Sequence, residues 1–521
     1  DLEEVLAVID EMAGIDEPEI CETKLDEILD GEMAYVSRLC SRDEHFEEYG
    51  QTAIKKEVEG IVDNGTFEIQ PTEIAELPIG TEVGNLGSIL TEKDVEIEGD
   101  PVYKGRVIYL GNNPKIVTEK GIKVLKGRSN IEPDDVWCMT AADHVSVRSV
   151  LSHSLKRNYK TYSADLKQAY LQSTALGRET YIKIEGAVLA AMPDEVKKAR
   201  EGFKSPVHKL LKALYGRTRS GHDWAVKLEA VMKGMGFERA HARGLFKHKV
   251  KDIVIAVYVD DMLVSCDDEH AKLFFEELAK HLKIKEWGET KRFLGIEYEL
   301  KKSSDGKIRT MILSMNSYIE KVLNDWQAKG FELTPRRTIT EQKDDPSSDT
   351  SNNSGDEFRP TIGALLWLVR CIRPDLSRCI GICGEKVTKW SETYTKFLHN
   401  VMCYLSHTKN KVMKMKYIEG DHLELVGHGD ASLNIPRSVS GSFIFLKGDQ
   451  GSFMPISWSS KRQPIATVSS AGSEYLALSS TVTKILNIHR SFKFIDLCDN
   501  VYPLNVLCDN NCVILGVNRG W

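Results

Sequence analysis

With 521 residues, 41% of them hydrophobic and 28% charged, the chain is too long for a single core, and its length predicts about three or four domains. It contains no run of about 18 apolar residues and no basic and apolar signal segment, which excludes a membrane-spanning helix and predicts a soluble, intracellular protein. Its 11 cysteines are odd in number and scattered along the chain, which argues against a disulfide scaffold.

The net charge of −8 alone argues against a nucleic-acid partner, but the distribution of charge reverses that conclusion. Residues 1–34 hold 13 acids and one lysine, and we expect residues 1–45 to form an acidic linker segment. Residues 197–251 hold 15 lysines and arginines against four acids, a local charge of +11. Such a run is usually a solvated face, yet this one directly precedes an acid pair beside which a phosphate backbone would lie.

The first elements predicted along the chain lead to that acid pair. The pattern becomes globular near Phe46, where IKKEVEGIVDNGTFEI predicts a helix followed by a strand. The segment TYSADLKQAYLQS, 161–173, predicts a short strand that ends at Asp165 and then a segment with helical character. In AVYVDDMLVS, apolar and β-branched residues flank Asp260 and Asp261, which predicts a tight hairpin with both acids at its turn.

Two interpretations of the acid pair are open at this point. Asp-Asp is an acceptable turn pair and short motifs often match by chance, so a solvated hairpin tip accounts for it about as well as a metal site does. Two carboxylates held within a few ångströms repel each other unless a cation, a proton or water compensates. Mg²⁺ prefers oxygen ligands and leaves positions open for substrate phosphates. A metal site would need a third carboxylate on a neighbouring strand, and Asp165 is the candidate.

The second half of the chain begins with the polar stretch TITEQKDDPSSDTSNNSGDEF, 338–358, which predicts a disordered linker. TIGALLWLVRCI and KFLHNVMCYL then predict helices. LELVGHGD, GSFIFLKG and MPISWSS predict three strands, followed by a helix from about Ser470 and the strand LNVLCD. Cys379 and Cys383 are spaced to share a helix face, but no histidine or cysteine pair completes a zinc site, so buried thiols are the favoured interpretation.

An ordered set of motifs decides between the two interpretations of the acid pair. DLKQAYL, KLLKALYGRTRSGHDW, YVDDMLV and FLGIEYEL resemble the reverse transcriptase of copia-type LTR retrotransposons in order and spacing. The resemblance extends to NGTFEI, YKGRVIYLGN and IRPDLS and covers about residues 46–521. It implies an α+β fold, a right-hand polymerase with fingers, palm and thumb, followed by an RNase H-like α/β domain. The implied divisions are fingers and palm 46–300, a thumb-like segment 301–337, the linker 338–358, a helical connection 359–418 and the RNase H-like domain 419–521.

On this resemblance, Asp165, Asp260 and Asp261 are the metal ligands of the palm and hold two Mg²⁺ ions, with Mn²⁺ as the alternative. Tyr170, five residues after Asp165, would stack under the sugar and exclude a 2′-hydroxyl, so that the enzyme selects dNTPs. Without the family context, a tyrosine near a strand end is otherwise a core residue.

The resemblance also implies three basic substrate-binding residues. Lys104 and Arg106 in YKGRV resemble the pair of the fingers that grips the triphosphate, although the Lys-Trp motif that precedes this pair in the family is not visible in GNLGSILTEK. Arg219 in LYGRTRSG stands where the family has a glutamine that contacts the template and the incoming nucleotide. An arginine there can still bind phosphate.

Three acids near the C-terminal end form a second candidate site, Asp430, Glu474 and Asp509, for which helix capping or solvated turns are the alternative. The surrounding RSVSGSFIFL, ISWSSKRQPIATVSSAGSEYLAL and CDNNCVI resemble the copia-type RNase H segment. The resemblance implies that these acids bind Mg²⁺ and activate water against the RNA strand of a hybrid. The family has a fourth carboxylate further on, whereas this sequence ends 12 residues after Asp509, so we expect a truncated RNase H domain.

The function implied is an RNA-directed DNA polymerase whose partners are an RNA template, a DNA or RNA primer, an RNA–DNA hybrid and dNTPs, without a membrane. We expect it in cytoplasmic virus-like particles, with the nucleus as the alternative, and the start DLEEV suggests a fragment of a longer product. Two alternatives are an inactive or repurposed remnant that binds nucleic acid without chemistry, and a nuclease in which the RNase H domain alone is active.

Overall fold

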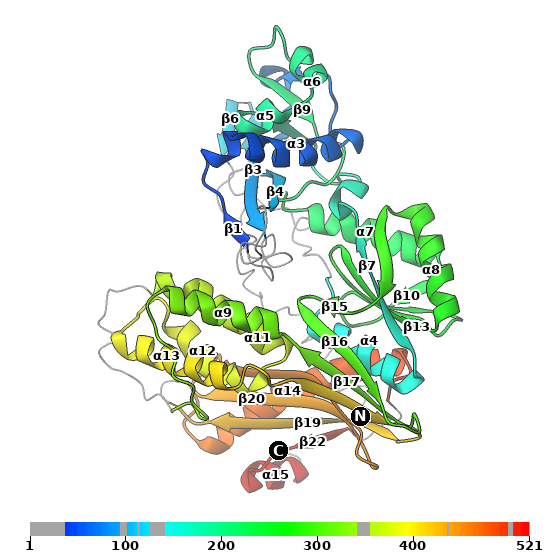
Figure 1. Ribbon diagram of the computed structural model, residues 1–521, viewed down its shortest axis with the longest axis vertical. Coiled ribbons are helices and arrows are strands. Elements are labelled where there is room, and N and C mark those ends of the chain that lie inside the picture. The colour runs from blue at the N-terminus through cyan, green and yellow to red at the C-terminus, as the bar shows by residue number, and fades with distance from the viewer. Residues whose placement is uncertain are drawn as a thin grey trace. The chain divides into compact units, whose positions relative to one another are not determined.

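A computed structural model describes part of the chain, namely residues 37–93, 102–111, 115–119, 121–124, 141–340, 355–434, 437–498 and 504–519. The chain divides into two compact units, the first made of 1–137 and 173–223 and the second of 138–172 and 224–521 (Figure 1). Most of the expected acidic linker, 1–36, and the centre of the 338–358 linker, 341–354, lie outside the described residues.

The first unit contains an eight-stranded sheet in the order β2-β9-β8-β3-β5-β6, with β1 and β4 also paired to β3. Helix α3 packs against β4, since Ile54, Val58 and Ile61 recur at helical spacing and are fully buried. The elements are β1 (Ser37–Leu39), α3 (Glu48–Asp63), β2 (Thr72–Glu73), β3 (Glu82–Lys93), β4 (Val102–Tyr109), β5 (Lys115–Thr118), β6 (Gly121–Val124), β8 (Thr180–Lys183), α5 (Gly186–Ala191), α6 (Asp194–Ala199) and β9 (Pro206–Lys209).

The prediction of a strand in NGTFEI is wrong. Phe67 makes one isolated bridge, to Leu210, and no strand forms around it. Gly65, the second residue of this segment, has a φ of +59°, so the chain turns within the segment, and Pro71 after it has no N–H to donate to a ladder. The helix expected before it is confirmed as α3.

The second unit begins with a six-stranded sheet in the order β10-β11-β12-β13-β7-β14. Helix α4 packs against β12 and β13. The side chain of Asp143 caps the start of this helix by accepting from Ser146 N–H at 2.7 Å, and left-handed Asn158 ends it. The elements are α4 (His144–Arg157), β7 (Lys160–Leu166), the 3₁₀ helix η5 (Ala169–Gln172), α7 (Ser220–Gly234, which begins in the first unit), β10 (Phe237–Arg239), β11 (Leu245–His248), β12 (Val254–Tyr258), β13 (Asp261–Cys266), α8 (Asp268–His281) and β14 (Ile284–Glu289).

A second, eight-stranded sheet runs through the rest of this unit in the order β15-β16-β17-β18-β21-β20-β19-β22. Helix α14 lies along β19 and β20, and helices α9, α11, α12 and α13 lie together beside the same sheet (Figure 1). The elements are β15 (Arg292–Phe293), β16 (Ile296–Lys302), β17 (Ile308–Ser314), α9 (Asn316–Ala328), α11 (Arg359–Cys371), α12 (Ser377–Lys386), α13 (Glu392–His407), β18 (Met413–Ile418), β19 (Leu423–Ser432), β20 (Val439–Gly448), β21 (Phe453–Arg462), α14 (Ser470–Phe494), β22 (Asn505–Leu507) and α15 (Asn511–Asn518).

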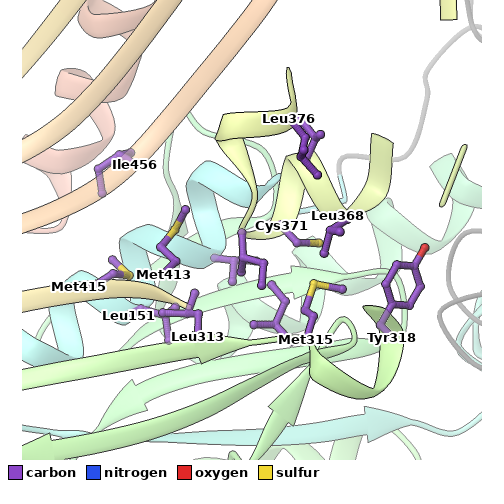
Figure 2. Close-up of a cluster of buried hydrophobic side chains, with 14 of the residues drawn as sticks. Leu151, Leu313, Met315, Tyr318, Leu368, Cys371, Leu376, Met413, Met415 and Ile456 are labelled. Carbon is purple, nitrogen blue, oxygen red and sulfur yellow. The ribbon is translucent and has the colours of Figure 1, made fainter. Parts of the chain in front are cut away.

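One hydrophobic core joins these parts of the second unit. It takes Leu151 from α4, Leu313 from β17, Leu368 from α11, Met413 from β18 and Ile456 from β21, all of which point into the cluster drawn in Figure 2. Segments separated by more than 300 positions in sequence therefore exclude water from the same interior.

The shared core of the second unit differs from the domain boundaries expected from the sequence. The boundary expected between residues 300 and 301 falls inside β16, and β17 pairs from Ile308 to Leu313 with β18, on the far side of the 338–358 linker. The strand order expected after residue 423, three strands, a helix and a further strand, is the order observed in β19, β20, β21, α14 and β22.

The described helices include none that combines the length and the apolar character needed to cross a membrane. Cys383 is fully buried, and burial raises the pKa of its thiol to about 12, in agreement with the buried-thiol interpretation of this cysteine.

Candidate active site

The Asp260–Asp261 hairpin has a two-residue loop. Tyr258 pairs with Asp261, so Val259 and Asp260 alone connect β12 to β13. Val259 has a φ of +57°, whereas Asp260 is not among the residues with positive φ, an arrangement typical of a type II′ hairpin turn. The expectation that both acids lie at a tight turn is confirmed, with Asp260 inside it and Asp261 as the first residue of β13.

Two hydrogen bonds hold this turn in place. The indole N–H of buried Trp224 donates to the carbonyl oxygen of Val259 at 2.8 Å, and Leu166 N–H donates to the carbonyl oxygen of Asp260 at 2.7 Å. The second bond fastens the turn to the end of β7, immediately after Asp165. Trp224 was not predicted from the sequence as part of the site, and no pattern in the sequence distinguishes it from other core aromatic residues.

Asp165 lies directly opposite Asp261 on the neighbouring antiparallel strand, as their Cα atoms are partners in the β7–β13 register. Side chains at such positions point to the same face, with Cβ atoms about 4.5 to 5.5 Å apart, and like charges there repel. Asp165 Oδ2 accepts from Lys285 Nζ at 2.7 Å, while Oδ1 is buried and has no hydrogen-bond partner. A buried carboxylate oxygen without a partner, beside a second carboxylate, fits a cation.

Carboxylate oxygens are the donors that Mg²⁺ prefers, so the residues present fit such an ion. The carboxylate oxygens of Asp165, Asp260 and Asp261 do not all lie within 4.8 Å of one another. Binding of an ion would therefore draw these three carboxylates closer together.

Tyr170 belongs to the same unit as these acids. It lies in η5, a short segment of helical character after Asp165 as expected, and it packs against the hydrophobic cluster shared by β7, β12 and β13. Tyr170 is only partly buried against this cluster, and its role as a contact to the sugar stays a prediction.

Lys104, Arg106 and Arg219 belong to the first unit. Lys104 and Arg106 lie two residues apart on β4, opposite Thr91 and Ile89 of β3, and so share one face of the sheet. Their grouping with the acids of the second unit stays a prediction.

Arg219 is held by a buried acid. Its Nε contacts Asp223 Oδ1 at 3.2 Å, while Arg217 contacts Oδ2 of the same carboxylate at 2.8 Å. Asp223 is 1% exposed, so both arginines of LYGRTRSG compensate one buried charge.

The C-terminal acids come together around Glu474. A carboxylate oxygen of Glu474, one of Asp509 and the Cys508 Sγ lie within 4.8 Å of one another. Burial first, and then the neighbouring charges of Asp430 and Asp509, raise the pKa of Glu474 above its ordinary value. Asp430 therefore lies near Glu474 but outside the close group. Cys508 was not predicted as a site residue, although its position next to Asp509 in CDNN was visible in the sequence.

The site lies on a sheet with paired acids at a hairpin turn, and comparison with known proteins shows which class of protein the chain resembles. Residues 111–340 match the family described as "Reverse transcriptase (RNA-dependent DNA polymerase)". The chain is 25% identical over 482 residues to the "Retrovirus-related Pol polyprotein from transposon TNT 1-94" of Nicotiana tabacum, a match that covers 89% of this chain. It is 28% identical over 388 residues, 70% of its length, to the corresponding polyprotein from transposon RE1 of Arabidopsis thaliana.

The chain is therefore similar to retrovirus-related Pol polyproteins of copia-type transposons, and residues 111–340 carry the match to a reverse transcriptase domain. It spans 33% and 24% of the length of the two relatives. Among solved structures it is similar to the foamy viral protease-reverse transcriptase in complex with ds DNA, at 14% identity and a TM-score of 0.38, over 88% of this chain and 62% of that one.

Proposed function

We propose that this chain is an RNA-directed DNA polymerase that adds deoxynucleotides to a primer 3′-hydroxyl, with Asp165, Asp260 and Asp261 holding two divalent ions. The observation that carries the proposal is the placement of Asp165 opposite Asp261 on adjacent strands, with a buried oxygen of Asp165 left without a partner. When bound, such ions lower the pKa of the attacking hydroxyl and stabilise the leaving pyrophosphate.

The contribution of the protein is to position these groups. The Val259–Asp260 turn, fastened by Trp224 and by the N–H of Leu166, fixes both hairpin acids against β7. Tyr170, packed against the same sheet, would lie under the sugar of the incoming dNTP and exclude a 2′-hydroxyl. Lys104, Arg106 and Arg219 would contact phosphates of the nucleotide and the template, which the protein recognises by backbone charge and shape.

We infer that the C-terminal acids act separately on the RNA strand of the hybrid. Asp430, Glu474 and Asp509 would hold divalent metal and activate water, as in an RNase H-like domain. The support is that Glu474 is 6% exposed and its Oε2 is buried without a hydrogen-bond partner, beside the carboxylate of Asp509.

The test is extension of a primed RNA template with dNTPs and Mg²⁺ by the wild type and by Asp260→Asn. The matched control is Asp305→Asn, which changes an exposed acid at the tip of another hairpin, between β16 and β17. We expect extension by the wild type and by the control and none by Asp260→Asn. Glu474→Gln should extend the primer but leave the RNA strand intact.

Two results would replace this proposal. Wild-type protein that binds the primed template without extending it would favour the nucleic-acid-binding remnant. Degradation of the RNA strand without extension would favour a protein in which the nuclease alone is active.

A further inference from the structure

The close group formed by Glu474, Cys508 and Asp509 mixes a thiol with two carboxylates, and among the described residues no other group of three potential metal ligands is as tight. Glu474 lies in the second turn of α14. Cys508 and Asp509 follow β22 directly, and Asn510 caps α15 by accepting from Cys512 N–H at 3.0 Å. Because β22 pairs with β19 on one side and α15 begins on the other, the backbone of Cys508 and Asp509 is held at both ends.

A second observation at the same place points to a cation. Glu474 is 6% exposed, and its Oε2 atom is buried and has no hydrogen-bond partner. A buried carboxylate oxygen that nothing compensates costs free energy, which a bound metal ion would recover. Cys508 is half-buried, so an ion can reach its sulfur from solvent.

One sulfur and two carboxylate oxygens differ from the all-oxygen ligands that Mg²⁺ prefers. Mg²⁺ binds oxygen ligands and gains little from sulfur. Thiolates favour Zn²⁺ and similar soft ions, for which one sulfur and two carboxylate oxygens leave a fourth position open to water. Tetrahedral bonds of about 2.0 to 2.3 Å place ligand atoms roughly 3.5 Å apart. Donor atoms already within 4.8 Å reach that spacing by small side-chain rotations.

We propose that Cys508 gives the C-terminal acid site a second metal preference: a thiophilic divalent ion, Zn²⁺ or Cd²⁺, binds Cys508, Glu474 and Asp509 and excludes Mg²⁺. On binding, the thiol loses its proton to solvent and the sulfur lone pair forms the metal bond. The consequence for RNA cleavage, inhibition by micromolar Zn²⁺ in the presence of Mg²⁺, rests on the proposed nuclease function. The binding itself does not.

The test uses the full chain and Cd²⁺, whose bond to a thiolate gives an ultraviolet charge-transfer band. We expect a band that saturates at one equivalent in the wild type and that Cys508→Ser abolishes. Cys512→Ser, which removes an exposed cysteine four residues away, is the control and should leave the band unchanged. Glu474→Gln should keep the band but weaken binding at least about tenfold, since removing even an outer partner of a metal ligand costs that much.

A band of unchanged size in Cys508→Ser, or its loss in Cys512→Ser instead, would overturn the proposal. Zn²⁺ release into a chromogenic chelator, compared between wild type and Cys508→Ser, provides a second measurement. If the protein degrades no RNA in Mg²⁺, the proposed nuclease function fails, while the Cd²⁺ band still decides whether Cys508 binds metal.

Discussion

Val259 adopts a backbone conformation that β-branched residues avoid, at the turn that carries Asp260. A strained residue of this kind costs on the order of 1 to 3 kcal/mol and persists where the surroundings enforce it, here through the hydrogen bond from Trp224. Val259→Gly should therefore raise the free energy of unfolding by about 1 kcal/mol, because glycine adopts positive φ without strain.

The same substitution should lower the rate of nucleotide addition, because a freer turn positions Asp260 and Asp261 less tightly. Denaturant unfolding and a primer-extension rate measure the two effects. A variant less stable than the wild type would contradict the assignment of strain to this residue.

Lys285 occupies one oxygen of Asp165, and both side chains are partly exposed, at 56% and 39%. This ammonium group repels a metal ion that binds the other oxygen of Asp165, Oδ1, and competes with it for the carboxylate charge. Exposed ion pairs contribute at most about 1 kcal/mol, so Lys285→Gln should lower the Mg²⁺ concentration for half-maximal extension by up to about fivefold. Lys301→Gln, which breaks another exposed pair, is the control. An unchanged or higher Mg²⁺ requirement in Lys285→Gln would count against a metal at Asp165.

Helix α14 places the side chain of Lys484 against the β20–β21 strand pair. Lys484 Nζ donates to the hydroxyls of Ser442 and Ser459 at 3.0 and 2.7 Å, and burial, with repulsion from Lys461, lowers the pKa of Lys484 to about 8. Below pH 8 the folded state carries a poorly solvated charge that the unfolded state holds at no cost. The contribution of this residue to stability therefore rises as pH increases from about 8 to about 10.5.

The difference in unfolding free energy between wild type and Lys484→Met should accordingly increase in favour of the wild type over this pH window, by roughly 2 to 3 kcal/mol. Urea unfolding at several pH values measures it. The Lys447→Met variant, which changes an exposed lysine of β20, should show a much smaller change. If the unfolding free energy of the wild type instead falls relative to that of Lys484→Met as pH rises, the predicted direction of the pH dependence is wrong.

At the scale of the whole molecule, Arg148 connects three parts of the second unit. Its guanidinium donates to the carbonyl oxygens of Ile456 at 2.9 Å, Cys371 at 2.9 Å and Arg370, and stacks 3.8 Å from the ring centre of Trp458. Helix α4 is thereby joined to α11 and β21, in addition to the shared core.

Arg148→Met leaves these buried carbonyls without donors, each at a cost of about 1 to 3 kcal/mol, so we expect a loss of at least about 3 kcal/mol. Arg239→Met, which removes a surface pair with Glu229, should cost under about 1 kcal/mol. Hydrogen exchange should show β12, β17 and β21 losing protection together. If the backbone amides of β21 stay protected from exchange while those of β12 lose protection, the prediction that these strands unfold together is wrong.

The sequence was sufficient for the features that depend on local pattern. The sequence predicted a short strand ending at Asp165 and a tight hairpin with Asp260 and Asp261 at its turn, and in the structure Asp165 and Asp261 are in register. Pairing of β17 with β18 depends on backbone bonds between segments about 100 residues apart, which no periodicity reveals. The φ of Val259 could not be predicted because the turn contains no glycine, the usual signal of positive φ.

The central claim, that Asp165 acts with the hairpin acids in nucleotide addition, is tested most directly by single-turnover incorporation of one dNTP on a primed RNA template. Asp165→Asn should slow incorporation at least about 100-fold, with template–primer affinity unchanged within a few-fold, because only charge stabilisation at the reacting atoms is lost. Asp325→Asn, an exposed acid of α9, should match the wild type. Incorporation by Asp165→Asn at the wild-type rate would contradict the account.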